Sequence, residues 1–74
     1  MSKKIYKTFP VLNMHAASCA TNVERAVGDL PGVFGATVDL VNNTVLIEYD
    51  PTRISVGEIR ASVLSDGYDI IVDQ

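Results

Sequence analysis

The chain has 74 residues, one cysteine and a formal net charge of −3. A chain this short has room for one domain with a modest core, so we expect residues 1–74 to form a single domain. Six lysines and arginines against nine acidic residues leave no cationic footprint, which argues against nucleic acid as a partner. A lone cysteine cannot form an internal disulfide, and the sequence has no long apolar run. It therefore predicts a cytoplasmic domain, or the cytosolic part of a membrane protein, without direct membrane contact.

The first predicted elements are a strand, a loop and a helix. Residues 4–12 are rich in Ile, Tyr, Thr, Phe and Val, which favours a strand, and Pro10 indicates an edge position or the end of that strand. Residues 13–17 are predicted as a loop. The helix that follows has Ser18 as its expected N-cap and Gly28 near its end. Its apolar stripe, at helical spacing, consists of Ala20, Val23, Ala26, Val27 and Leu30.

A hairpin is predicted next. Its strands cover residues 33–41 and 44–49 and meet at Asn42-Asn43, because asparagine tolerates the positive φ of a tight turn. The residues expected to share one face of each strand are Phe34, Ala36, Val38 and Leu40 on the first, and Val45, Ile47 and Tyr49 on the second.

The last part of the chain predicts a second helix and a short strand. Ser55 followed by Glu58 is a capping-box pattern, and Gly67 ends the helix that it opens. The apolar residues of this helix are Val56, Ile59, Val63 and Leu64. Residues 68–72 form the last strand. The order β-α-β-β-α-β predicts the α+β class and the ferredoxin-like arrangement, in which two helices cover one face of a four-stranded antiparallel sheet.

The loop before the first helix carries the most informative residues. Residues 13–19 read Asn-Met-His-Ala-Ala-Ser-Cys, and this stretch resembles the Gly-Met-x-Cys-x-x-Cys loop of the heavy-metal-associated domain family. Met14 matches the methionine and Cys19 the second cysteine, whereas Ala16 stands at the first cysteine and Asn13 at the glycine. The resemblance covers residues 4–72, nearly the whole chain, and includes Leu30-Pro31-Gly32-Val33, Tyr49-Asp50-Pro51 and Gly67-Tyr68.

The resemblance implies copper(I) binding and delivery, because the family includes small copper chaperones and the N-terminal metal-binding domains of copper-transporting P-type ATPases. Copper(I) is a soft ion that favours thiolates, and two cysteines at the family's spacing hold it in near-linear geometry. The N-terminus of a helix favours the thiolate form, an advantage that Cys19 keeps. Ala16 cannot ligate a metal, so we expect copper binding by this chain to be weak or absent.

The other residues near the motif are expected to play supporting roles. Met14 is expected to pack into the core and so support the loop, and His15 is expected to be solvated and not a ligand. Tyr68 faces the site and either shields it or packs beside it. Residues 13–21 contain no carboxylate, which favours copper(I) over zinc. Ala16 is either a replacement made in a two-cysteine parent, which the intact rest of the motif favours, or a natural divergence.

The resemblance also implies partners. Copper would pass by ligand exchange to or from a copper chaperone or an ATPase metal-binding domain, and Cys19 of two chains could bridge one copper ion. The chain is not expected to be an enzyme, although it could be an excised domain of a transport ATPase. Acylphosphatases of similar size bind phosphate with an arginine, and the first loop has none. An RNA-binding module would need more aromatic and basic residues. The remaining alternative is a regulatory or partner-docking domain of the same fold that binds no metal.

Overall fold

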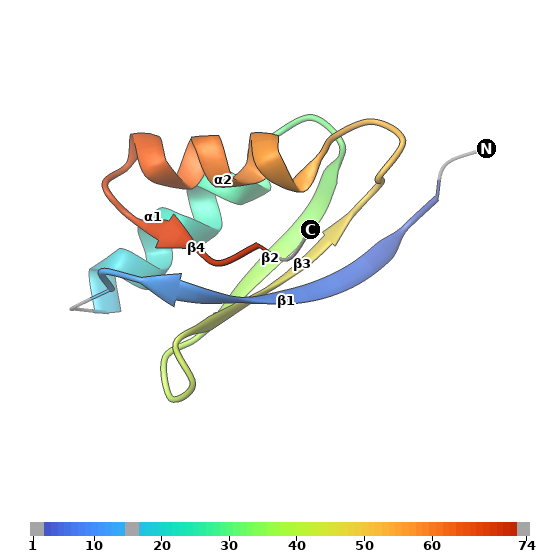
Figure 1. Ribbon diagram of the computed structural model, residues 1–74. Coiled ribbons are helices and arrows are strands. Elements are labelled where there is room, and N and C mark those ends of the chain that lie inside the picture. Colours follow the sequence, from blue (N-terminus) through green and yellow to red (C-terminus); the bar gives the residue numbers. More distant parts are fainter. Residues whose placement is uncertain (1–2, 15–16, 73–74) are drawn as a thin grey trace.

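The structure is a computed structural model that describes residues 3–14 and 17–72. Its elements are β1 (Ile5–Leu12), α1 (Ala17–Gly28), β2 (Val33–Asp39), β3 (Thr44–Tyr49), α2 (Val56–Ser65) and β4 (Asp69–Ile70). The four strands form one antiparallel sheet in the order β2-β3-β1-β4, and Figure 1 shows both helices on the same face of it. The predicted ferredoxin-like βαββαβ fold is confirmed.

The core lies between the sheet and the two helices. β3 alternates as predicted, since Val45, Ile47 and Tyr49 are buried while Leu46 is 41% exposed on the other face. The helices contribute the fully buried residues Val23, Val27, Ile59 and Val63. Leu64, which the helical pattern included in the apolar stripe, is instead 48% exposed.

β1 is an internal strand, so the predicted edge position of Pro10 is wrong. The N–H of Val11 donates to the carbonyl of Asn43 on the β3 side at 2.8 Å, and the carbonyl of Pro10 accepts from Ile71 on the β4 side at 3.0 Å. The nitrogen and carbonyl of one strand residue point to the same side, so the missing N–H of Pro10 faces β4. The carbonyl of Pro10 thus makes one of the two bonds of an antiparallel pair with Ile71, and its missing N–H leaves out the other, which agrees with a β4 register that covers only Val11 and Leu12.

β2 contains an irregularity that the sequence pattern did not predict. The register shifts between Val33 and Gly35, which leaves Phe34 as an extra residue in a β-bulge. Val33 then packs against the core, whereas Phe34 is 49% exposed instead of sharing a face with Ala36. β2 also ends at Asp39 and not at residue 41, because the Asp39 carboxylate accepts from the N–H of Val41 at 2.9 Å and so begins the turn.

The helix start and the last strand also differ from the prediction. α1 begins at Ala17, so Ser18 lies inside its first turn and is not the N-cap. The capping box of α2 is confirmed, with Ser55 as N-cap and Glu58 as its reciprocal partner. β4 has two residues where five were predicted. At 12 and 10 residues, neither helix of the described chain is long and apolar enough to cross a membrane.

The turn after α1 packs against the segment between β3 and α2. Gly32 has a φ of 92°, and its carbonyl accepts from the N–H of Asp50 at 2.8 Å. Asp50 is fully buried, and its Oδ1 accepts from the hydroxyl of Thr52 at 2.6 Å and from the N–H of Thr52 at 2.9 Å. The hydroxyl of Thr52 is the main cause that holds the pKa of Asp50 below its ordinary value, so the carboxylate is the stable form here.

The open edge of β2 is partly covered by a side chain from α1. Glu24 extends from the helix, and its Oε2 accepts from the backbone N–H of Val38 at 2.7 Å. An unpaired N–H on an edge strand is a template for pairing with another chain, and this contact satisfies it. The helix that carries Cys19 is thereby tied to the sheet at β2.

Candidate metal site

The structure describes the loop between β1 and α1 on either side of residues 15 and 16. Asn13 follows β1 with a φ of 68°, a left-handed conformation that asparagine adopts more readily than most residues. This explains how asparagine can stand where the family pattern has glycine. Met14 is half-buried and packs against the core. His15 and Ala16 lie outside the described residues, and their expected roles stay predictions.

Cys19 is the third residue of α1 and is half-buried. The N–H groups of a helix's first turn have no partner inside the helix, and the helix dipole places partial positive charge there. A sulfur in this turn is therefore in a place that favours the thiolate, the form that binds metal. The side chain of Cys19 interacts with Tyr68, a second residue that the sequence placed near the site.

Tyr68 is aimed at α1 by the way α2 ends. The N–H of Tyr68 donates to the carbonyl of Val63 at 3.2 Å, and the N–H of Gly67 donates to the carbonyl of Leu64 at 3.0 Å. With Gly67 at a φ of 91°, these bonds form a Schellman motif, which reverses the chain. The hydroxyl of Tyr68 then forms a hydrogen bond with Cys19, and this bond is the main cause that raises the pKa of Tyr68.

Asn22 is a residue of this site that the sequence interpretation missed. Its Nδ2 lies 3.5 Å from the hydroxyl oxygen of Tyr68, and its hydrogen bond opposes the effect of Cys19 on the pKa of that hydroxyl. Asn22 follows Cys19 by three residues on α1, so the two side chains share a helix face. This spacing of three residues was the sequence signal that could have placed Asn22 near Cys19.

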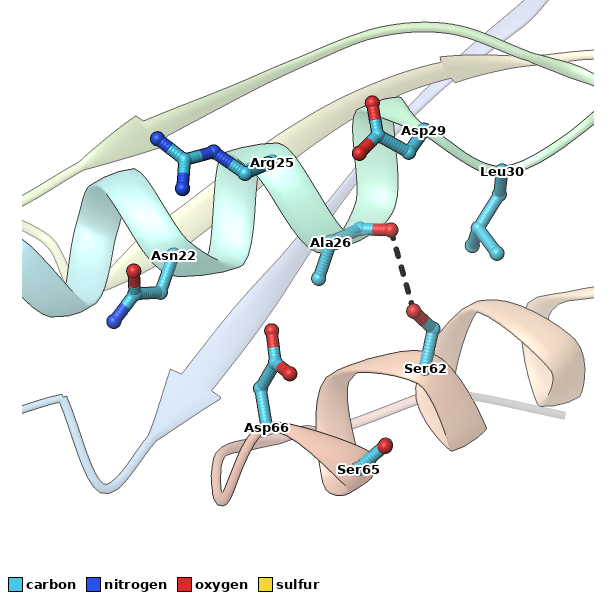
Figure 2. A pocket seen from close by; sticks show the side chains of 8 residues that line it. All are labelled: Asn22, Arg25, Ala26, Asp29, Leu30, Ser62, Ser65 and Asp66. Carbon is cyan, nitrogen blue, oxygen red and sulfur yellow. Dashed lines mark hydrogen bonds between the residues drawn. The ribbon is translucent and has the colours of Figure 1, made fainter.

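A polar groove lies beside the site, between α1 and α2. It is lined by Asn22, Arg25, Ala26, Asp29, Leu30, Ser62, Ser65 and Asp66. Figure 2 shows Ser62 pointing from α2 to α1, where its hydroxyl donates to the carbonyl of Ala26 at 3.2 Å. Asn22 both lines the groove and contacts Tyr68, so the groove begins at the site.

One kind of metal site is absent from the part of the chain that the structure describes. Within residues 3–14 and 17–72, no three side chains of His, Cys, Asp or Glu are grouped so that they could hold a metal ion. Cys19 is the only cysteine of the sequence, and its side chain interacts with the hydroxyl of Tyr68, which in turn contacts Asn22. This arrangement suits a soft, thiophilic ion better than a hard one.

Comparison with known proteins gives consistent matches. The family profile described as "Heavy-metal-associated domain" matches residues 8–69. A protein named copper chaperone CopZ from Staphylococcus haemolyticus is 38% identical over 66 residues, which are 89% of this chain and 97% of that protein. A probable copper-transporting ATPase, HMA5 from Arabidopsis thaliana, is 36% identical over 61 residues, which are 82% of this chain but 6% of that ATPase.

Solved structures agree with the sequence comparison. The N-terminal domain of a potential copper-translocating P-type ATPase from Bacillus subtilis, determined in its Cu(I)-loaded state, has a TM-score of 0.85 and 30% identity. The match covers 97% of this chain and 88% of that one. A whole small chaperone and a short part of a long transport ATPase are thus both similar to this chain.

Proposed function

The chain belongs to the heavy-metal-associated domain family, and from this premise we propose that it is a copper(I)-binding and delivery domain whose site is impaired by Ala16. The observation that carries the proposal is the position of Cys19, in the first turn of α1 and in contact with Tyr68. The names of similar proteins, a copper chaperone and a copper-transporting ATPase, support copper as the cargo.

The impairment follows from the donor set. Copper(I) is held best by two soft ligands, and this sequence offers a single thiolate because Cys19 is its only cysteine. Met14 packs against the core, which directs its thioether away from the role of a second ligand. A methyl group at position 16 has no lone pair to donate. Copper binding by this chain is therefore weak or absent, while its two-cysteine form would bind copper(I) tightly.

Transfer would proceed by ligand exchange with a second protein. A thiolate of the partner attacks bound copper(I), both proteins share the ion, and the weaker ligand then leaves. The partner is a copper chaperone or an ATPase metal-binding domain, and the chain itself catalyses no covalent reaction. Because a thiolate ligand must stay reduced, the proposal places the domain in the cytosol, either as a free chaperone or as part of a transport ATPase.

Copper could also be shared between two copies of the chain. Cys19 from each copy would supply the two thiolates that one copy lacks. Sedimentation under reducing conditions, with and without copper(I), tests this bridge. A dimer that forms only with copper(I) supports it, and a monomer in both samples contradicts it.

The main test is copper(I) affinity, measured by competition with a chromophoric chelator. The chain itself should compete poorly, and Ala16→Cys should bind far more tightly because it restores the second thiolate. Ala16→Ser is the matched control, since it adds an atom of similar position without a thiolate. If Ala16→Cys also fails to bind, the copper proposal is wrong, and the domain is better described as a partner-docking module that binds no metal.

A further inference from the structure

The two edges of the sheet differ in how far they are covered. On the β2 edge, the carboxylate of Glu24 accepts from the N–H of Val38 at 2.7 Å. The other edge is shared by β4 and β1, because β4 pairs only with the last two residues of β1 and one further bond joins Ile71 to the carbonyl of Pro10. Figure 1 shows β1 continuing past the end of β4, so the N-terminal half of β1 is itself an edge of the sheet.

Two residues of β1 present their backbone groups at this edge. The N–H of Val11 donates on the β3 side, and successive residues of a strand point to opposite sides. The N–H and carbonyl groups of Tyr6 and Thr8 therefore point away from β3. Within residues 3–14 and 17–72, these groups have no hydrogen-bond partner. Such unpaired groups on an edge strand are a template for pairing with another extended chain.

A pocket of about 240 Å³ lies along the same edge. It is lined by Lys7, Thr8, Phe9, Pro10 and Ile71, so it begins where β4 stops. Space is thus available beside β1 at the unpaired groups of Thr8. Lys7 is exposed, and within the part of the chain that the structure describes it forms no ion pair. The edge therefore offers backbone donors and acceptors together with the charge of one ammonium group.

The charge of Lys7 distinguishes the occupants that such an edge could take. Two copies of the chain would pair all these groups if Tyr6 of each lay opposite Thr8 of the other in antiparallel register. That register places Lys7 directly opposite Lys7 of the second copy, in a non-hydrogen-bonded pair where the side chains are closest. Like charges directly opposite each other destabilise a sheet, whereas opposite charges stabilise it. A segment with a carboxylate at that position therefore fits the edge better than a second copy does.

We propose that the open edge of β1 binds an extended segment of another protein as an added strand, and that this segment carries an acidic side chain opposite Lys7. The backbone groups of Tyr6 and Thr8 hydrogen-bond to the segment and fix its position without reading its sequence. The pairing of its carboxylate with Lys7 selects acidic segments. Neither interaction involves Cys19 or copper, so this binding goes beyond the proposed function and does not depend on it.

The test is an NMR titration of the isotope-labelled, metal-free chain at low ionic strength, where charge pairs are least screened. The probes are the peptide acetyl-Thr-Val-Glu-Val-Thr-amide and the same peptide with lysine at its centre. The glutamate peptide should shift the amide resonances of Tyr6 and Thr8 and slow their hydrogen exchange, because both N–H groups gain an acceptor. The lysine peptide should bind roughly 5-fold more weakly, the effect of one cross-strand charge pair.

Two variants separate the role of charge from the role of the backbone. Lys7→Glu should reverse the preference, so that the lysine peptide binds more tightly than the glutamate peptide. Lys3→Glu is the matched control, because it makes the same change of charge at an exposed residue outside β1, and it should keep the preference of the parent chain. Thr8→Pro should weaken the binding of both peptides, because it removes an N–H at the edge and leaves the ladder with β3 intact, as Pro10 does. Circular dichroism checks that Thr8→Pro is folded, and Lys7→Glu changes no backbone group.

Three results would overturn the inference. In the first, the amide resonances of Tyr6 and Thr8 do not respond to the glutamate peptide, or the shifts lie elsewhere on the chain. In the second, the two peptides bind equally well, or Lys7→Glu does not reverse their order. In the third, the same resonances of the parent chain shift with its own concentration, which would make a second copy the occupant. The copper(I) competition with Ala16→Cys can fail while the peptide binds, so the two proposals are separable.

Discussion

Gly32 and Gly67 adopt almost the same backbone conformation in different surroundings. Their φ angles are 92° and 91°, in the region that residues with a Cβ rarely occupy. A Cβ on Gly32 would lie 3.1 Å from side-chain atoms of Arg53 and Ile54, whereas a Cβ on Gly67 would meet nothing within 4 Å. A comparison of substitutions at Gly32 and Gly67 therefore distinguishes the cost of backbone strain from the cost of steric crowding.

Replacing each glycine by alanine should destabilise the domain to different extents. Gly67→Ala should cost about 1–2 kcal/mol from the left-handed backbone alone, and Gly32→Ala should cost more because Ile54 must also move. Urea unfolding measures both. Gly28→Ala, at a position with free space and no positive φ, is the control and should be neutral or slightly stabilising. Equal losses in the two variants would contradict this reasoning.

At the scale of elements, one ion pair fastens the short β4 to α2. The guanidinium of Arg60 donates to both carboxylate oxygens of Asp69, with Nε–Oδ1 at 2.8 Å and Nη2–Oδ2 at 3.1 Å. Oδ1 also accepts from the N–H of Ile70 at 2.8 Å. The hydrogen bond with Arg60 is the main cause that lowers the pKa of Asp69. Because β4 has only two residues, this side-chain contact supplements a very short ladder.

The lowered pKa of Asp69 predicts a contribution to stability that depends on pH. A carboxylate whose folded pKa lies below its unfolded value of about 3.9 stabilises the fold above that value, and the contribution is lost as pH falls through the folded pKa. Asp69→Asn should therefore lower the free energy of unfolding at neutral pH and reduce its loss on acidification. Urea unfolding at neutral and acidic pH gives both quantities. A parallel acid dependence in parent and variant would exclude the role of Asp69.

The sequence was sufficient for the order and type of every element but not for their irregularities. Periodicity and turn residues predict strands and helices because each signal is local, as in the capping box at Ser55. The bulge at Phe34 and the internal position of Pro10 depend on partners across the sheet, which no single segment specifies. The prediction of Ser18 as N-cap was wrong because α1 already begins at Ala17, and the residue type alone did not fix where the helix starts.

The candidate site was predictable only where its residues belong to a motif. Cys19 and Met14 were recognised by their spacing, and Tyr68 by its place after Gly67. Asn22 was not, since an asparagine on an exposed helix face is common and its partner lies 46 residues away. That Tyr68 faces the site could be expected from the family resemblance, while its contact with Asn22 required the structure.

At the scale of the whole molecule, stability depends on a small core. A domain of 74 residues is expected to be stable by roughly 4 to 11 kcal/mol in total. Ile47 is fully buried at the centre of the sheet, while its neighbour Leu46 is 41% exposed on the face without helices. Adjacent residues of one strand thus differ almost completely in what they contribute to the fold.

Truncation of Ile47 and of Leu46 should show how much more stability a core position contributes than a surface position. Ile47→Ala should cost about 2–5 kcal/mol, enough to leave much of the protein unfolded at moderate temperature, because it creates a cavity in the core. Leu46→Ala should cost less than about 1 kcal/mol. Thermal unfolding followed by circular dichroism measures the difference. A loss in Leu46→Ala as large as that in Ile47→Ala would indicate that the helix-free face is covered in solution.

The hydrogen bond from the N–H of Val38 to Glu24 has a consequence for the association of two sheets. Two sheets with exposed edge strands can join edge to edge into a continuous sheet. A strand approaching β2 would first have to displace a charged carboxylate from the N–H that it needs, and would also have to dislodge a side chain anchored on α1. The β2 edge of the sheet is thereby protected at Val38 by the same helix that carries Cys19.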